Sequence, residues 1–228
     1  MTIKAVLLDL DDTLWPVVPV IQHAEATLYT WMQQHVPSVT AEHDMASLRA
    51  MRQALVMSDP RFSYDLWALR HQLLQNVFSQ HGEDVAKADQ AMAVFAHARN
   101  QVSLYPDVAP ALGELSLRVK LGTVSNGFAD LHAIGLAGLF EVSVAAHQFG
   151  CAKPDARIFH AACDGLGLTP DEVLYVGDDL LLDVQGAQQA GLMAGWMNRR
   201  GLMNDDPRQT HVKPDAEFKD LHDLTQWL

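Results

Sequence analysis

The sequence has little cysteine and no long apolar run. Its two cysteines, Cys151 and Cys163, are too few for a disulfide framework, and neither lies in a C-x-x-C pair. We therefore expect two reduced thiols, as is usual in cytosolic proteins. The first apolar run ends at Asp9, too early for a signal peptide or a membrane span. These absences predict a cytoplasmic protein with no membrane partner.

Basic residues are also scarce. The 228 residues include 16 Lys and Arg against 28 Asp and Glu, which gives a net charge of −12. Because no Lys/Arg run offers a surface for counterion release, we expect no nucleic-acid partner. An anionic substrate must then be held by local groups, such as a metal ion, one or two cations and backbone N–H groups. The hydrophobic fraction of 49% supports a sizeable core.

What the sequence does contain is a series of short apolar runs, each ending in polar residues. Such runs are typical of parallel strands that are covered by helices on both faces. Helical patterns separate the later runs, which predicts an α/β fold with a Rossmann-like parallel sheet and right-handed crossovers. The expected strands are Ile3–Leu10, Val119–Val124, Val142–Ala146, Val173–Val176 and Met193–Met197, and the expected helices are Pro106–Leu117, Asp155–Leu166 and Leu181–Ala190.

The segment after the first strand has a different sequence pattern, in which almost nothing resembles a strand. Helices are expected at about 20–35, 41–57, 63–81 and 84–99. Val36-Pro37-Ser38 breaks the first two, and Thr40 is predicted to be an N-cap. We therefore expect an α/β core of residues 1–15 and 102–228, with residues 16–101 inserted as an all-helical cap domain.

Two polar clusters follow early strands. Asp9-Leu10-Asp11-Asp12 follows the first strand, where neighbouring carboxylates repel one another unless a cation binds. Taken alone, this cluster is as readily an ordinary acidic turn. Ser125-Asn126-Gly127 follows the second strand and could form an anion-binding nest, although by itself it favours a simple strand-to-helix turn.

Two further clusters follow later strands. Pro154 suits the first turn of a predicted helix, and Lys153 lies just before it, where a cation is electrostatically misplaced unless an anion is nearby. Gly177-Asp178-Asp179 and Asp183 supply the hard oxygen ligands that Mg²⁺ prefers. Because parallel strands end at one edge of the sheet, all four clusters should converge there. Carboxylates, a divalent metal, a lysine and N–H donors are what phosphoryl transfer requires.

The order of these motifs resembles the haloacid dehalogenase superfamily, in the branch with a helical cap after the first motif. Asp9-x-Asp11-x-Thr13, then Ser125, then Lys153-Pro154, then Gly177-Asp178-Asp179-x-x-x-Asp183 match its four motifs. The resemblance implies that Asp9 is the nucleophile, forming an aspartyl-phosphate, and that Asp11 is the general acid and base. It also implies a Mg²⁺ cofactor.

The resemblance assigns further residues. Mg²⁺ would be held by the Asp9 carboxylate, the Asp11 backbone carbonyl and Asp178, with Asp179 or Asp183 as a direct, water-mediated or orienting partner. Ser125 and Lys153 would bind the phosphoryl oxygens, and Asn126 could add its backbone N–H. Dehalogenases of the superfamily lack a counterpart of Asp11, so its presence favours a phosphatase. A phosphomutase or a 2-haloacid dehalogenase is the alternative.

The substrate is predicted only as a small phosphate ester. The sequence is similar to bacterial phosphatases of flavin mononucleotide and of 5-amino-6-(5-phospho-D-ribitylamino)uracil, although Val17 and Val18 stand where relatives often carry polar residues. Trp15 could form an apolar wall for such a ring or pack the hinge. Arg99 could contact substrate or form a hinge salt bridge. We expect a monomer or a weak homodimer.

Overall fold

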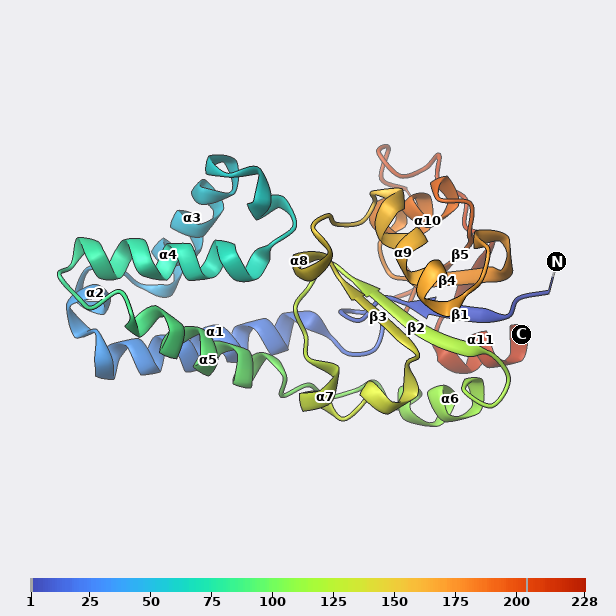
Figure 1. The fold of residues 1–228 in the computed structure, drawn as a ribbon, viewed down its shortest axis with the longest axis horizontal. Helices are drawn as coiled ribbons and strands as arrows, with labels where there is room; N and C mark the ends of the chain where they lie inside the picture. The colour runs from blue at the N-terminus through green and yellow to red at the C-terminus, as the bar shows by residue number, and fades with distance from the viewer. Residues whose placement is uncertain (1, 204) are drawn as a thin grey trace. The chain divides into compact units, whose positions relative to one another are not determined.

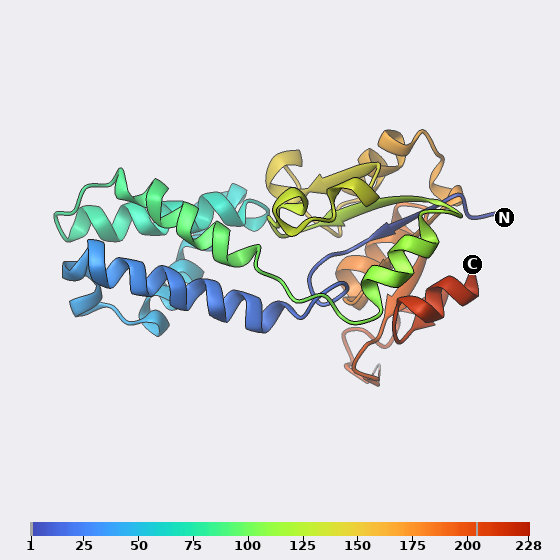
Figure 2. The same ribbon diagram turned by 90° about the horizontal axis from the view of Figure 1, so that it is seen from below.

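The computed structural model describes residues 2–203 and 205–228 as two compact units. The first unit comprises residues 2–16, 103–127 and 135–228, and the second comprises residues 17–102 and 128–134. Figures 1 and 2 show the first as a sheet with helices and the second as helices alone. No helix among the described residues is both long and apolar enough to cross a membrane.

The first unit is built on a six-stranded sheet in the order β3-β2-β1-β4-β5-β6. Every neighbouring pair is parallel. The buried residues of β1 and β4 explain this arrangement, since strands apolar on both sides need cover on both faces. The strands are β1 (Ala5–Leu8), β2 (Lys120–Ser125), β3 (Val142–Ala145), β4 (Val173–Gly177), β5 (Met193–Met197) and β6 (Ala216–Phe218). The predicted α/β fold class is therefore confirmed.

Helices cover both faces of this sheet. On one face α6 (Val108–Leu115) packs against α11 (Leu221–Trp227), and on the other α9 (Ala156–Leu166) packs against α10 (Gly186–Gln189), as Figures 1 and 2 show. Asp155 caps α9, and Gly167 ends it with φ 67°. The short elements are α8 (Ala146–Phe149), η3 (Ala137–Leu139), η4 (Pro170–Glu172) and the π-helical turn η5 (Leu180–Gln185).

Three details of this unit differ from the sequence prediction. The strand β6 was missed, because three residues are too few to show a period. The expected helix Leu181–Ala190 is two elements, η5 and α10. Pro154 lies before the N-cap of α9 rather than in its first turn, because Asp155 accepts from the Arg157 N–H and so begins the helix one residue later.

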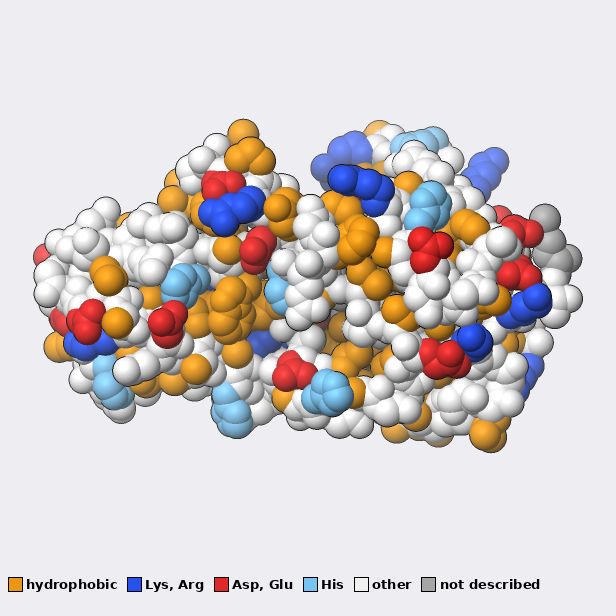
Figure 3. Space-filling view, in the orientation of Figure 1, with side chains coloured by type: hydrophobic (Ala, Val, Ile, Leu, Met, Phe, Trp, Pro, Cys, Tyr) orange, Lys and Arg blue, Asp and Glu red, His pale blue; other side chains and the backbone are white. Residues whose placement is uncertain are grey.

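The second unit is a bundle with its own apolar core, formed by buried residues such as Leu28, Met32, Leu74, Val77 and Phe95. Its elements are α1 (Val17–His35), α2 (Pro37–Glu42), α3 (Met45–Leu55), η1 (Val56–Ser58), η2 (Pro60–Ser63), α4 (Leu66–Gln80), α5 (Lys87–Arg99) and α7 (Leu131–Ile134). Figure 3 shows acidic and basic side chains interspersed on its visible face.

Two expectations for the helical unit need correction. Thr40 lies inside α2, and Asp44 is the N-cap of α3, accepting from the Ser47 N–H at 2.7 Å. Residues 128–134 were assigned to the core but pack with the helices. The reason is the Phe128 ring, whose centroid lies 5.5 Å from that of Trp67 and 6.0 Å from that of Phe95.

Candidate active site

The strand ends of the α/β unit bring the predicted site residues together. Asp9 follows β1, Ser125 ends β2 and Asp178 follows β4, and these three strands are neighbours in the sheet. The Asp9 N–H donates to the Val176 carbonyl at 2.9 Å, which extends the β1–β4 ladder to Asp9. One pocket is lined by Asp9, Asp11, Asp12, Ser125, Asn126, Lys153, Asp178, Asp179 and Asp183. The predicted convergence is therefore present in the structure.

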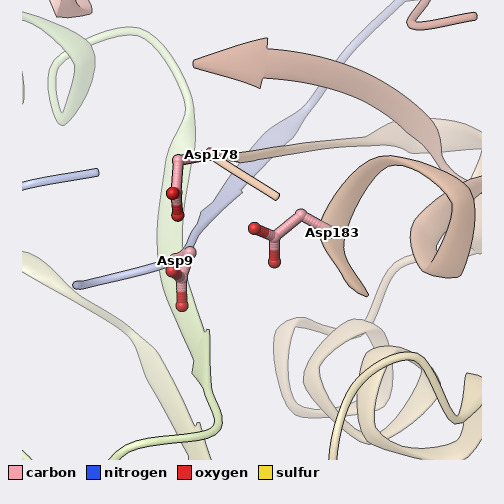
Figure 4. Close-up of side chains that lie close together, drawn as sticks. All are labelled: Asp9, Asp178 and Asp183. Carbon is pink, nitrogen blue, oxygen red and sulfur yellow. The ribbon is translucent and has the colours of Figure 1, made fainter. Parts of the chain in front are cut away.

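Three carboxylates form the acidic centre of this pocket. One oxygen from each of Asp9, Asp178 and Asp183 lies within 4.8 Å of the others. Figure 4 shows Asp178 and Asp183 extending toward Asp9 from different segments. Oxygen ligands converging in this way suit a hard divalent cation such as Mg²⁺.

Burial and neighbouring carboxylates raise the pKa values of Asp9 and Asp178. Burial, partly offset by Lys153 and reinforced by Asp183, raises the pKa of Asp9 to about 7. Burial, with repulsion from Asp183 and Asp9, raises the pKa of Asp178 to about 8. One lysine does not neutralise this cluster, so a further positive charge is needed to keep both aspartates ionised at neutral pH. The donor set and its charge thus fit a divalent metal ion.

Lys153 lies at the centre of the buried network. Its Nζ donates to Asp9 Oδ1 and to Asp183 Oδ1, each at 2.6 Å, and to the Tyr175 hydroxyl at 2.9 Å. Burial by itself lowers the pKa of Lys153, but attraction to Asp183 and Asp9 outweighs it and raises that pKa overall. The lysine therefore stays charged next to Asp9, where it can attract an anionic oxygen.

Asp183 acts mainly on the lysine. Its Oδ1 accepts from Lys153 and from the Tyr175 hydroxyl, and its Oδ2 accepts from the Asp179 N–H at 2.9 Å. Gly177 allows this approach, because a Cβ there would lie 2.3 Å from the Asp183 carboxyl carbon. Both oxygens of Asp183 are thus engaged by the protein, which favours an orienting role over direct metal binding.

Asp179 is also engaged by the backbone. Its Oδ1 accepts from the N–H groups of Leu181 and Leu182, both at 2.8 Å, and so caps η5. This cap sets the direction of the turn that carries Asp183. The sequence left open whether Asp179 or Asp183 contacts the metal directly. In the structure, the carboxylates of both residues accept hydrogen bonds from backbone N–H groups.

Asn126 clamps the lysine segment. Its side-chain Oδ1 accepts from the Lys153 N–H at 2.8 Å, and its Nδ2 donates to the Lys153 carbonyl at 3.1 Å. The expected contact between the Asn126 backbone N–H and phosphate stays a prediction, and the Asn126 side chain holds the Lys153 backbone in place. Ser125 is buried, and its hydroxyl accepts from the Gly127 N–H at 3.0 Å. Both residues line the pocket as predicted.

The loop after Asp9 folds back on itself. The Asp12 N–H donates to the Trp15 carbonyl at 2.7 Å, and Asp12 has φ 57°, in the left-handed region. The Trp15 indole N–H donates to Asp11 Oδ1 at 2.8 Å. The carboxylate of Asp11 therefore lies outside the acidic trio, and one of its oxygens is held by Trp15.

Two of the predicted substrate contacts, Trp15 and Arg99, are buried side chains. Trp15 is fully buried, so its ring offers no face for a ligand, and its role is the bond to Asp11. The expectation of an apolar wall at Trp15 is not supported. Arg99 is buried in α5 of the helical unit, 2% exposed, and its contact with a substrate stays a prediction.

The sequence analysis missed three supporting residues. The Tyr175 hydroxyl lies 3.1 Å from the Val124 carbonyl and joins β2 to the Lys153–Asp183 pair. Trp196 Nε1 donates to the Asp178 carbonyl at 2.8 Å, and Arg199 Nε donates to the Thr13 carbonyl at 2.8 Å. The available signal for Tyr175 was a polar aromatic residue two positions before Gly177, in an otherwise aliphatic strand.

Comparison with known proteins identifies a family of hydrolases that this chain resembles. Residues 3–191 match the family model of haloacid dehalogenase-like hydrolases. The chain is 30% identical to the 5-amino-6-(5-phospho-D-ribitylamino)uracil phosphatase YigB of Escherichia coli K12, covering 99% of this chain and 96% of that protein. It is 30% identical to the glyceraldehyde 3-phosphate phosphatase of Methanopyrus kandleri, covering 99% and 98% of the two chains.

A solved structure is also similar along the whole chain. The crystal structure of 2-haloacid dehalogenase from Pseudomonas syringae pv. Tomato DC3000 has a TM-score of 0.90 and 35% identity, and all of both chains is covered. The two kinds of relative differ in the bond that their names say they break. The residues around Asp9 must therefore decide between these chemistries.

Proposed function

This chain belongs to the haloacid dehalogenase-like hydrolases and is a phosphatase, and we propose that it works with Mg²⁺ through an aspartyl-phosphate on Asp9. The observation that carries the proposal is the contact of Lys153 with Asp9 inside a trio of carboxylates. This arrangement supplies a nucleophile, a fixed positive charge and a set of metal ligands at one point. Phosphoryl transfer is catalysed mainly by such positioning and charge compensation.

In the first step, an Asp9 carboxylate oxygen attacks phosphorus, and the bond from phosphorus to the ester oxygen breaks. Asp11 gives its proton to the departing alkoxide, so that an alcohol leaves. In the second step, Asp11 takes a proton from water while the water oxygen attacks phosphorus, and the Asp9–phosphorus bond breaks. Inorganic phosphate is released and Asp9 is restored.

The other groups bind and orient the phosphoryl group. Lys153 attracts one of its oxygens, and the Ser125 hydroxyl donates to another. The carboxylates of Asp9 and Asp178, with the Asp11 backbone carbonyl, would hold Mg²⁺, which supplies charge neutralisation between nucleophile and phosphate. Tyr175, Asp183 and Asn126 keep Lys153 in place.

The nucleophile assignment is tested with Asp9→Asn and Asp11→Asn on p-nitrophenyl phosphate, with and without Mg²⁺. We expect Asp9→Asn to lower kcat by about a thousandfold or more. Asp11→Asn should still form phosphoenzyme that can be trapped by acid quench and detected as an added phosphate mass on Asp9. Wild-type turnover by Asp9→Asn, or full activity in EDTA, would refute the mechanism.

For the substrate, we propose a phosphate ester of the riboflavin pathway, either flavin mononucleotide or 5-amino-6-(5-phospho-D-ribitylamino)uracil. The support is the full-length similarity to a phosphatase named for the second compound. A phosphate-release screen that includes both compounds and unrelated sugar phosphates tests this. A kcat/KM for either compound no higher than for the sugar phosphates would contradict it.

Dehalogenation is the second candidate chemistry, favoured by the similarity to a 2-haloacid dehalogenase. Asp11 argues against it, because halide is a good leaving group that needs no proton. Halide release from a 2-chloro acid, measured beside phosphate release, separates the two reactions. A phosphomutase would instead return the phosphoryl group to a second hydroxyl, giving an isomeric ester and no inorganic phosphate.

A further inference from the structure

The helical unit contains a cluster of charged side chains that the proposed reaction does not use. Glu25 of α1 is 8% exposed and lies among three arginines from two other helices. Arg49 Nε donates to Glu25 Oε2 at 2.5 Å, and Arg52 donates to Glu25 Oε1 at 3.0 Å. Arg70 of α4 approaches Glu25 Oε1 to 3.6 Å, beyond hydrogen-bond distance.

The charges of this cluster do not balance. Three guanidinium groups face one carboxylate, which leaves an excess of two positive charges. A carboxylate accepts about four hydrogen bonds, whereas three guanidinium groups offer about fifteen N–H donors. The excess is notable in a chain whose net charge is −12. Glu25 alone therefore cannot satisfy these arginines.

The shortage of hydrogen-bond acceptors in this cluster is clearest at Arg70. Its residue is 8% exposed, and within residues 2–203 and 205–228 its buried Nε has no hydrogen-bond partner. Its guanidinium carbon lies 3.8 Å from the centroid of the Phe95 ring, which fixes the plane of the group. Burial, with repulsion from Arg52, lowers the pKa of Arg70 to about 9, so it is still charged at neutral pH. A buried donor without an acceptor is costly unless a ligand supplies one.

The cluster lines a pocket whose other walls are apolar. Leu28, Met32, Leu48, Leu73 and Leu74 contribute to it, and Glu25 with the three arginines supplies its charged groups. Arg49 has a side chain that is 47% exposed, so the charged end reaches solvent. A charged mouth and an apolar wall are typical of sites for small amphipathic ligands.

The helix α3 forms one side of the pocket and is the least anchored element there. None of its residues is buried, and its packing residues Leu48 and Met51 are only partly so. Its ion pairs from Arg49 and Arg52 to Glu25 tie it to α1. An anion that bridges Arg52 and Arg70 would tie α3 to α4 as well.

We infer that this pocket is a second ligand site, which binds a small dianionic organic phosphate with an apolar body. A dianion matches the excess of two charges, and phosphate oxygens match the fork of donors on each guanidinium. The apolar body would contact the leucine and methionine wall. The site lies within the helical unit and does not depend on the chemistry at Asp9.

The test is a calorimetric titration of the full chain with phenylphosphonate at about pH 8 in EDTA, where this probe is a dianion. Without a metal, the carboxylate trio of the α/β unit repels the probe. We expect saturable binding of one probe per chain, which Arg52→Gln weakens by about tenfold or more, or about 1.4 kcal/mol. Methylphosphonate, which lacks the apolar body, should bind more weakly.

The matched control is Arg61→Gln, which removes the same charge from the same unit at a residue paired with Asp59. It should bind phenylphosphonate like the wild type, and so should Asp9→Asn. A wild-type chain that binds no probe, or an Arg52→Gln chain that binds it equally well, would overturn the inference.

A second measurement does not rely on a variant folding correctly. Adding phenylphosphonate to wild-type protein should slow amide hydrogen exchange in residues 45–55, the helix that the ligand would tie down. Protection confined to residues outside the helical unit would refute the site.

Discussion

At the scale of single residues, the site depends on side chains that hold other side chains. Lys153 is held by Asp183, by Tyr175 and by the Asn126 side chain, which bonds to the Lys153 backbone, so its ammonium group reaches Asp9 in one orientation. Asp11 is held in a similar way by the indole N–H of Trp15. Orientation of this kind lowers the entropy that the reacting groups lose on reaching the transition state.

Trp15→Phe should therefore affect the proton-transfer step selectively. The variant keeps an aromatic ring but loses the N–H that orients Asp11. We expect kcat for an alkyl phosphate, whose leaving group needs a proton, to fall by about tenfold, with a smaller loss for p-nitrophenyl phosphate. Steady-state kinetics on both substrates measure the ratio.

Trp227→Phe, on α11 and 43% exposed, is the matched control and should change neither rate. Equal losses on the two substrates for Trp15→Phe would show that Trp15 supports the fold and has no particular effect on Asp11.

At the scale of elements, the strand ends decide the geometry of the site. The parallel order β2-β1-β4 places Ser125, Asp9 and Asp178 side by side, although they are far apart in the sequence. The turn η5 carries Asp183, which lies so close to Gly177 that no side chain would fit between the two residues. A glycine at this point is required by packing rather than by backbone conformation.

Gly177→Ala should consequently disrupt the turn. The added Cβ would meet the Asp183 carboxyl carbon at 2.3 Å, so Asp183 must move away from Lys153. Overpacking of this kind costs about 1–3 kcal/mol, and we expect kcat to fall by about tenfold or more. Thermal unfolding and phosphatase assays measure the two effects.

Gly113→Ala in α6 is the control, because a Cβ there meets nothing within 4 Å. Alanine has the higher helix propensity, so this change should leave activity intact and raise stability by up to about 1 kcal/mol. A Gly177→Ala chain with wild-type kcat would show that the Asp183–Lys153 contact is dispensable.

At the scale of the whole molecule, negative charge is concentrated in one pocket, where Lys153 balances only part of it. An aspartate whose pKa is higher when folded than when unfolded takes up a proton on folding. Its contribution to the free energy of unfolding therefore falls as pH rises from its unfolded value to its folded value. For Asp9 and Asp178 the unfolded value is 3.8 and the folded values are about 7 and about 8.

In EDTA, the melting temperature should therefore fall between about pH 5 and about pH 8. Mg²⁺ replaces the bound protons, so it should raise the melting temperature strongly near pH 8 and little near pH 5. A Mg²⁺ concentration about a hundredfold above its Kd should add about 2.7 kcal/mol at the higher pH. Differential scanning fluorimetry at both pH values measures this, with Asp178→Asn as the variant that should lose most of the Mg²⁺ effect.

The sequence alone was enough to predict the α/β class, the helical insertion and the residues that meet at the sheet edge. The reason is that apolar strands of fixed direction leave little choice about where their ends lie. Asp9, Ser125, Lys153 and Asp178 were identified by this argument and by the order of the motifs.

The tertiary structure decided which partner each of these residues has. A hydrogen bond between residues distant in the chain, such as that from Lys153 to Tyr175, has no periodic signal in the sequence. For the same reason the role of Trp15 as a partner of Asp11, the clamp by Asn126 and the unbalanced arginines around Glu25 became visible only when the helices and strands were placed. The periodicity of the sequence therefore predicts helices and strands, whereas the packing of these elements decides which side chains are in contact.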